Sequence, residues 1–126
     1  MKPAVQRGIE ELRETFPGAA VSVEEDGDGG AYVTLEPVPL GELYTQADTW
    51  VGFHISFQYP ASDVYPHFVR GDLSRRDGGP LGAGTSNTQY RGKNATQLSR
   101  RSNKLDPAFQ TAAHKLLKVL AWLVNR

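Results

Sequence analysis

The 126-residue sequence predicts an α+β domain in which two helices pack on an antiparallel sheet. This prediction rests on an amphipathic helix at the N-terminus, a run of short strands with alternating apolar residues, and an amphipathic helix at the C-terminus. A chain of this length and ordinary apolar content buries one core without disulfides or metals. We therefore expect a single domain over residues 1–126.

The first element is a helix over residues 3–16. Apolar residues recur in it at steps of four, three and four, namely Val5, Ile9, Leu12 and Phe16. This spacing gathers them on one helical face, which is typical of a helix packed on a core. Pro17-Gly18 is a helix-stop signal and sets the expected end.

Four strands are expected next: Ala19–Glu25, Ala31–Val38, Trp50–Gln58 and Phe68–Arg70. The glycine-rich turn at residues 26–30 joins the first two strands into a hairpin. The third alternates most regularly, with Val51, Phe53, Ile55 and Phe57 on one face.

Residues 71–105 show almost no periodic apolar pattern, and we predict a long loop there. Loops of this length inside a compact domain usually carry function or are disordered. The last helix is expected to begin at Asp106-Pro107, an N-cap residue followed by proline at the first helical position.

Two motifs link this order of elements to a known family. Tyr59-Pro60 and Tyr65-Pro66 lie between the third and fourth strands, and Leu105-Asp106-Pro107 opens the final helix. The first motif resembles the Tyr-Pro-x-x-Pro-Pro turn of the ubiquitin-conjugating enzyme (UBC-like) superfamily, lengthened here by a few residues, and the second is similar to the family's Trp-Ser-Pro after the active site. Residues 92–105 look most like divergent bacterial members.

The resemblance implies a UBC-like fold: an N-terminal helix, a four-stranded antiparallel meander, a long active-site loop and a C-terminal helix. It also implies partnership with a ubiquitin-like protein and a ubiquitin-activating-like enzyme in a bacterial conjugation pathway. Active members carry the modifier as a thioester on a cysteine and have an upstream His-Pro-Asn motif. This chain has neither the cysteine nor that motif.

A transferase of this kind would therefore need a Ser or Thr nucleophile, with the modifier held as an oxyester. Ser99 is one candidate, since Arg100 and Arg101 beside it would stabilise an oxyanion or bind a carboxylate. The other candidates are Ser86 and Thr85, with Asn87 as the oxyanion donor.

Neither candidate site has a general base close in sequence, so His54 or His67 would have to approach through folding. Alternatively, these are ordinary solvated loop hydroxyls, because Ser and Thr are common in loops.

Two other functions stay open. An inactive variant would only bind a ubiquitin-like protein or an activating enzyme, and the resemblance places such contacts on the N-terminal helix, at Arg7 and Arg13. The third alternative, a nucleic-acid-binding module, rests on Arg91, Lys93, Arg100, Arg101 and Lys104 around Tyr90, Asn94 and Asn103. One aromatic residue is too few for a stacking platform, which disfavours nucleic acid as the partner.

The composition excludes several other classes. The absence of cysteine rules out disulfides and thiolate metal sites, and the three histidines lack ligand spacing, so neither a metal nor a cofactor is predicted. The net charge is zero, but residues 1–63 hold eleven acidic and three basic side chains, and residues 64–126 hold the reverse. With no signal-like or membrane-spanning run, we expect a cytoplasmic protein that does not enter a membrane.

Overall fold

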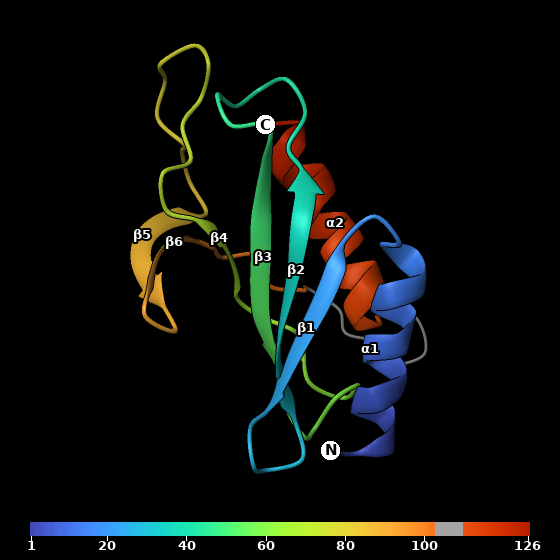
Figure 1. Cartoon of the computed structure of the whole chain (residues 1–126). Helices are drawn as coiled ribbons and strands as arrows, with labels where there is room; N and C mark the ends of the chain where they lie inside the picture. The colour runs from blue at the N-terminus through green and yellow to red at the C-terminus, as the bar shows by residue number, and fades with distance from the viewer. Residues whose placement is uncertain (103–109) are drawn as a thin grey trace.

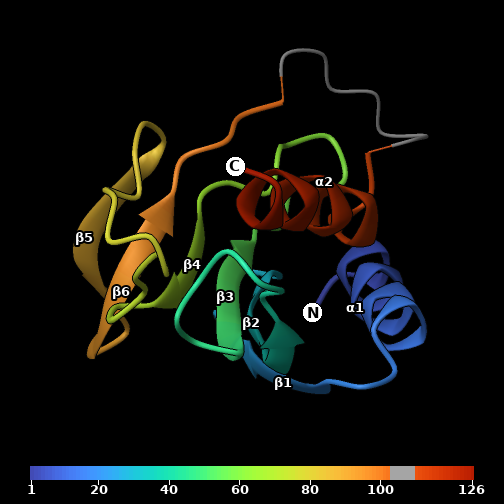
Figure 2. The same ribbon diagram turned by 90° about the horizontal axis from the view of Figure 1, so that it is seen from above.

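The computed structural model describes residues 1–102 and 110–126 as an α+β fold with helices on one face of an antiparallel sheet (Figures 1 and 2). In chain order, its elements are α1 (Pro3–Thr15), β1 (Ala20–Glu25), β2 (Ala31–Pro39), β3 (Asp48–Ile55), β4 (His67–Arg70), β5 (Thr85–Tyr90), β6 (Lys93–Leu98) and α2 (Ala112–Val124). The strand order across the sheet is β1-β2-β3-β4-β6-β5. The first four strands therefore pair in sequence, and β6 lies between β4 and the edge strand β5.

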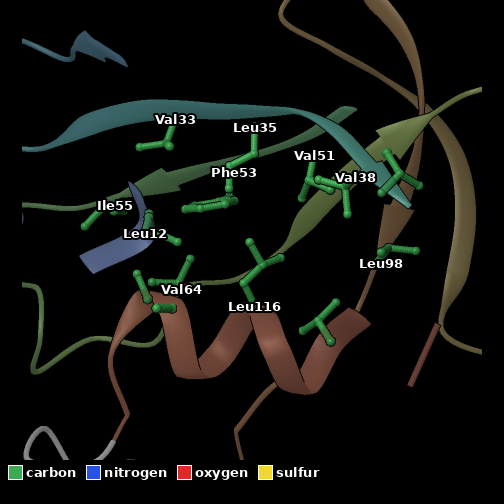
Figure 3. Close-up of a cluster of buried hydrophobic side chains, with 14 of the residues drawn as sticks. Leu12, Val33, Leu35, Val38, Val51, Phe53, Ile55, Val64, Leu98 and Leu116 are labelled. Atoms are coloured by element: carbon green, nitrogen blue, oxygen red, sulfur yellow. The ribbon is translucent and has the colours of Figure 1, made fainter. Parts of the chain in front are cut away.

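The core lies between the sheet and the helices, and Figure 3 shows it from the side. Its largest fully buried side chains include Leu12 of α1, Leu35 of β2, Phe53 of β3, Leu98 of β6 and Leu116 of α2. One cluster of buried side chains joins both helices to the sheet. Burying apolar surface is the dominant favourable term in folding, so this shared cluster stabilises the layers as a unit.

The α+β class and both terminal helices are confirmed, but the prediction of four strands is wrong. The described residues form six, because the predicted loop contains β5 and β6. The two strands are joined by a two-residue turn at Arg91-Gly92, in which both residues have positive φ (50° and 84°). That geometry suits a tight hairpin, and glycine adopts it without steric cost.

Two element boundaries differ from the predictions by more than two residues. The third strand stops at Ile55 because a turn follows, in which the Tyr59 N–H donates to the Ser56 carbonyl at 3.0 Å. Phe57 consequently lies outside the strand and is 47 % exposed. The predicted helix start at Asp106-Pro107 lies outside the described residues; α2 begins at Ala112 with Thr111 as its N-cap, and Gln110 and Thr111 are not helical, so the helix is shorter than predicted.

Candidate functional site

A serine, a lysine and an aspartate from three distant parts of the chain meet in one cluster. The Lys115 Nζ donates to the Ser102 Oγ at 2.9 Å and to the Asp63 Oδ2 at 3.0 Å. The Ser102 Oγ donates to the Asp63 Oδ1 at 3.0 Å, and the Ser102 N–H donates to the Asp63 Oδ2 at 2.8 Å. The hydroxyl is thus held between an ammonium and a carboxylate.

Each of these side chains is positioned by a different element. Asp63 belongs to the segment between β3 and β4, which is anchored at Tyr59, whose hydroxyl accepts a hydrogen bond from the Ala112 N–H at 2.9 Å. Lys115 lies on the first turn of α2 and is only 4 % exposed. Ser102 follows β6 along the chain. The Tyr-Pro segment therefore brings the carboxylate to the helix.

The Asp63 carboxyl is held in its charged form. Burial raises its pKa, but the Ser102 N–H, the Lys115 ammonium and the Ser102 hydroxyl outweigh burial and hold the pKa below its ordinary value. A buried ion pair with additional hydrogen bonds satisfies the charges that desolvation would otherwise make costly. The Ser102 hydroxyl is therefore held beside the Lys115–Asp63 ion pair.

His67 lies in the core close to this cluster. It is fully buried and packs against the Phe53 ring with centroids 5.1 Å apart, and neither of its ring nitrogens has a hydrogen-bond partner among the residues that the structure describes. Burial lowers its pKa to about 3, with a further lowering from the Lys115 charge that Asp63 partly opposes. The imidazole is consequently neutral over the physiological range.

The cluster opens into a pocket of about 390 Å³. Its other lining residues include the cations Arg100, Arg101 and Lys118, together with Gln110. The Arg101 guanidinium lies 4.1 Å from the Tyr65 ring centroid, and that of Arg100 lies 5.0 Å from the Trp122 ring centroid. Since Asp63 neutralises only Lys115, the described lining of the pocket has an excess of positive charge, which favours an anionic ligand.

The predicted nucleophiles Ser99 and Thr85 meet at one end of the β5–β6 hairpin. The Ser99 N–H donates to the Gly84 carbonyl at 2.8 Å, and its Oγ accepts from the Gln97 Nε2 at 3.1 Å. The Thr85 Oγ1 donates to the Gly82 carbonyl at 2.7 Å. Both hydroxyls thus have local polar partners, and none of these partners is a base.

Ser86 and Asn87 are exposed neighbours on β5. Successive strand residues point to opposite faces, so the Asn87 amide is directed away from the Ser86 hydroxyl and does not form an oxyanion donor for it. His54, one of the two predicted bases, pairs instead with Asp26, its Nε2 lying 2.6 Å from the Oδ2.

Of the predicted binding residues, Arg100 and Arg101 line the Ser102 pocket, whereas Arg7 and Arg13 lie on the exposed side of α1. The Arg13 Nη2 donates to the Val21 carbonyl at 3.4 Å. Arg7 borders a small pocket of about 200 Å³ beside Tyr59.

The basic residues assigned to nucleic-acid binding divide between two places. Arg91 and Lys93 sit on the β5–β6 hairpin, over the rings of Tyr32 and Trp50 at 4.0 and 4.5 Å, away from the Ser102 pocket. Asn103 and Lys104 lie outside the described residues. A single phosphate-binding stripe is therefore not formed by the described members of this set.

Sequence reasoning missed Ser102, Lys115 and Asp63. Ser102 lies in the same serine- and arginine-containing run as Ser99, so its position gave no signal. Lys115 did give one, because it interrupts the apolar face of α2. A lysine on the buried face of a helix needs a partner, because a buried charge is otherwise very costly. Asp63, in the middle of the Tyr-Pro motif, supplies that partner.

Comparison with protein-family models, with curated proteins and with solved structures gave no match to this chain. Among the described residues, no three His, Cys, Asp or Glu side chains come together as a metal site requires. No helix in that part of the chain is long and apolar enough to cross a bilayer.

Proposed function

We propose that the chain is a divergent ubiquitin-conjugating-like protein that receives the C-terminal tail of a ubiquitin-like modifier from an activating enzyme. The order α1, four sequentially paired strands and a C-terminal helix supports this proposal. The β5–β6 hairpin stands where the resemblance leads us to expect an extended active-site segment. Ser102 follows this hairpin along the chain, and we assign the chemistry to it instead of to Ser99, Ser86 or Thr85.

The observation that carries the proposal is the Ser102 hydroxyl, 2.9 Å from a buried lysine ammonium and 3.0 Å from a carboxylate. A serine hydroxyl is a weak nucleophile at its free pKa and needs such neighbours. The cations Arg100 and Arg101 at the pocket would attract a carbonyl or carboxylate oxygen of the modifier's tail.

In the proposed transfer, the Ser102 Oγ attacks the thioester carbonyl carbon of the modifier on its activating enzyme. The Oγ–C bond forms, and the C–S bond breaks with its electron pair leaving on the thiolate, which solvent then protonates. The hydroxyl proton passes to the Asp63 Oδ1, which already accepts its hydrogen bond. Because a low pKa makes Asp63 a weak base, the adjacent Lys115 ammonium must stabilise the negative charge that develops on the Oγ.

A non-covalent function is the second candidate, and the positive charge of the pocket favours it. In that case Lys115, Arg100 and Arg101 hold the modifier's terminal carboxylate through charge-assisted hydrogen bonds, and no ester forms. The protein would then bind a modifier or its activating enzyme without transferring it.

Reconstitution separates the two candidates. The protein is incubated with ubiquitin-like modifiers, their activating enzymes and ATP, and adducts are resolved with and without reducing agent. An adduct that survives reduction but is cleaved by hydroxylamine indicates an oxyester, and we expect it to disappear in Ser102→Ala and to persist in Ser99→Ala and Ser86→Ala.

Binding without any adduct would support the non-covalent function. Loss of the adduct in Ser99→Ala, with Ser102→Ala unaffected, would move the nucleophile back to the residue predicted from sequence. Both candidates would be contradicted if the protein formed no adduct and showed no binding, provided that the activating enzymes used do charge their own partners.

A further inference from the structure

A second and larger cavity lies on the sheet face opposite to the helices. Strand residues alternate between faces, and Trp50 of β3 points away from the core that its neighbour Val51 enters. The cavity is about 590 Å³, and its lining includes Glu36, Asp48, Trp50, Asn87, Thr88 and Asn94. These side chains come from β2, β3, β5 and β6, so the groove runs between the middle of the sheet and the β5–β6 hairpin.

The hairpin is fixed over this face by contacts at its tip. Tyr90 packs so closely on Gly52 that an added Cβ would lie 2.6 Å from the Tyr90 Cε2. The Tyr90 ring also stacks on Phe68, with centroids 4.2 Å apart. Arg91 forms an ion pair with Glu24 of β1. The groove is therefore formed before any ligand arrives, as small-molecule and peptide sites usually are.

The electrostatics of the groove are the reverse of those in the Ser102 pocket. Arg70 donates to both carboxylate oxygens of Asp72 at 2.6 and 2.9 Å and to the Asp48 carbonyl at 2.8 Å, so one acid of the lining is already neutralised. Arg70 also interacts electrostatically with Asp48, so among the described lining residues one cation faces the three carboxylates of Glu36, Asp48 and Asp72. The groove consequently has an excess of negative charge next to an aromatic ring.

The Trp50 ring already contacts a cation from this chain. The Lys93 ammonium lies 4.5 Å from the Trp50 ring centroid, and tryptophan is the best aromatic partner for a cation. Lys93 is exposed and has a flexible stem, so it can leave the ring when another cation arrives.

We infer that this groove binds a lysine or arginine side chain from a basic segment of a partner protein. The incoming cation packs on Trp50 and is paired by the Glu36 and Asp48 carboxylates, and Asn87 and Asn94 line the same groove. The same carboxylates repel phosphate, which disfavours a nucleotide in this groove. The inference does not depend on the chemistry of Ser102.

A short peptide in which arginine and lysine alternate with glycine and serine tests the inference. It is titrated into ¹⁵N-labelled protein at low salt, and a matched peptide with glutamate at the basic positions is the ligand control. We expect shifts centred on the Trp50 indole and on the Asn87 and Asn94 side-chain amides. Affinity should weaken roughly tenfold in Glu36→Gln/Asp48→Asn, and less in Trp50→Leu.

Glu10→Gln/Glu14→Gln is the matched control, since it removes the same charge from the exposed face of α1 and should leave binding unchanged. The unperturbed amide spectrum of each variant shows that it folds. Equal loss of affinity in both double variants would overturn the inference, because binding would then follow net charge alone. So would tighter binding of a single-stranded oligonucleotide in the groove.

Discussion

The two faces of the sheet carry sites of opposite character. On the helix side, the Ser102 pocket is built on a nearly buried lysine and has an excess of cations. On the open side, the groove is lined by exposed carboxylates around Trp50. The net charge of zero thus hides two local fields of opposite sign, each suited to a different partner. The burial of the charges differs as well, so the same kind of substitution should have different consequences on the two sides.

The largest effect is expected for Lys115→Met. It leaves the Asp63 carboxylate partly buried without its cation, and breaking such a pair costs about 3 kcal/mol. Urea denaturation measures the free energy of unfolding. Lys118→Met is the matched control, because Lys118 is exposed at the same pocket and should change that free energy by less than about 0.5 kcal/mol. Equal effects of the two substitutions would show that the buried ion pair does not stabilise the fold.

His67 should make the helix side sensitive to acid. Its folded-state pKa of about 3 lies below the unfolded value of about 6.5, so between these pH values the unfolded chain binds the proton and the folded chain does not. The stability that depends on this group is therefore present above about pH 6.5 and is lost as the pH falls. At pH 4 the loss in the free energy of unfolding amounts to about 3 kcal/mol.

Asp63 adds a loss at lower pH. Because its folded-state pKa is lowered, its contribution is present above its ordinary pKa and is lost as the pH falls through the folded-state value. Unfolding free energies measured across this range should fall less steeply below pH 6.5 in His67→Leu than in the unmodified protein. Parallel profiles for the two proteins would contradict the buried, neutral imidazole.

Gly52→Ala should loosen the hairpin that walls the open groove. The new Cβ would meet the Tyr90 ring, and overpacking of this kind costs about 2 kcal/mol. Gly18→Ala is the control, because nothing lies within 4 Å of a Cβ at that position. If thermal unfolding does not distinguish the two variants, Tyr90 does not pack on β3 as described.

The smallest stability effect is expected for Glu36→Gln/Asp48→Asn. Both carboxylates are exposed, so the free energy of unfolding should change by less than about 0.5 kcal/mol although peptide binding weakens. A large destabilisation would mean that these acids maintain the fold, and the contrast between the two faces would then be lost.

The terminal helices and the first strands could be predicted because their apolar residues recur at the right period. Val33 and Leu35 alternate on β2, and Ile9 and Leu12 share a face of α1. The hairpin escaped prediction because Thr85–Tyr90 is almost entirely polar and exposed. Its one local signal was Gly92, which permits the positive φ of a two-residue turn.

The sequence pointed to two of the residues that line the Ser102 pocket, but not to Ser102 itself. Arg100 and Arg101 were expected beside a candidate nucleophile, and in the structure they line the Ser102 pocket. The proposed nucleophile, Ser102, could not be chosen from sequence, because its hydroxyl is held by Asp63 and Lys115, which lie 39 and 13 positions away in sequence. The local sequence does not distinguish Ser102 from Ser99. The two serines differ because the packing of α2 against the Tyr-Pro segment places Lys115 and Asp63 beside Ser102 alone among the two.

Labelling with a fluorophosphonate probe, which reacts with activated serines, tests the central claim most directly and needs no partner. Mass spectrometry of the labelled protein should place the modification on Ser102. We expect the label to disappear in Ser102→Ala, to decrease strongly in Lys115→Met, and to remain in Ser99→Ala. Labelling at Ser99 or Ser86, or no labelling of the folded protein under conditions that label a known serine enzyme, would contradict the assignment of Ser102 as the nucleophile.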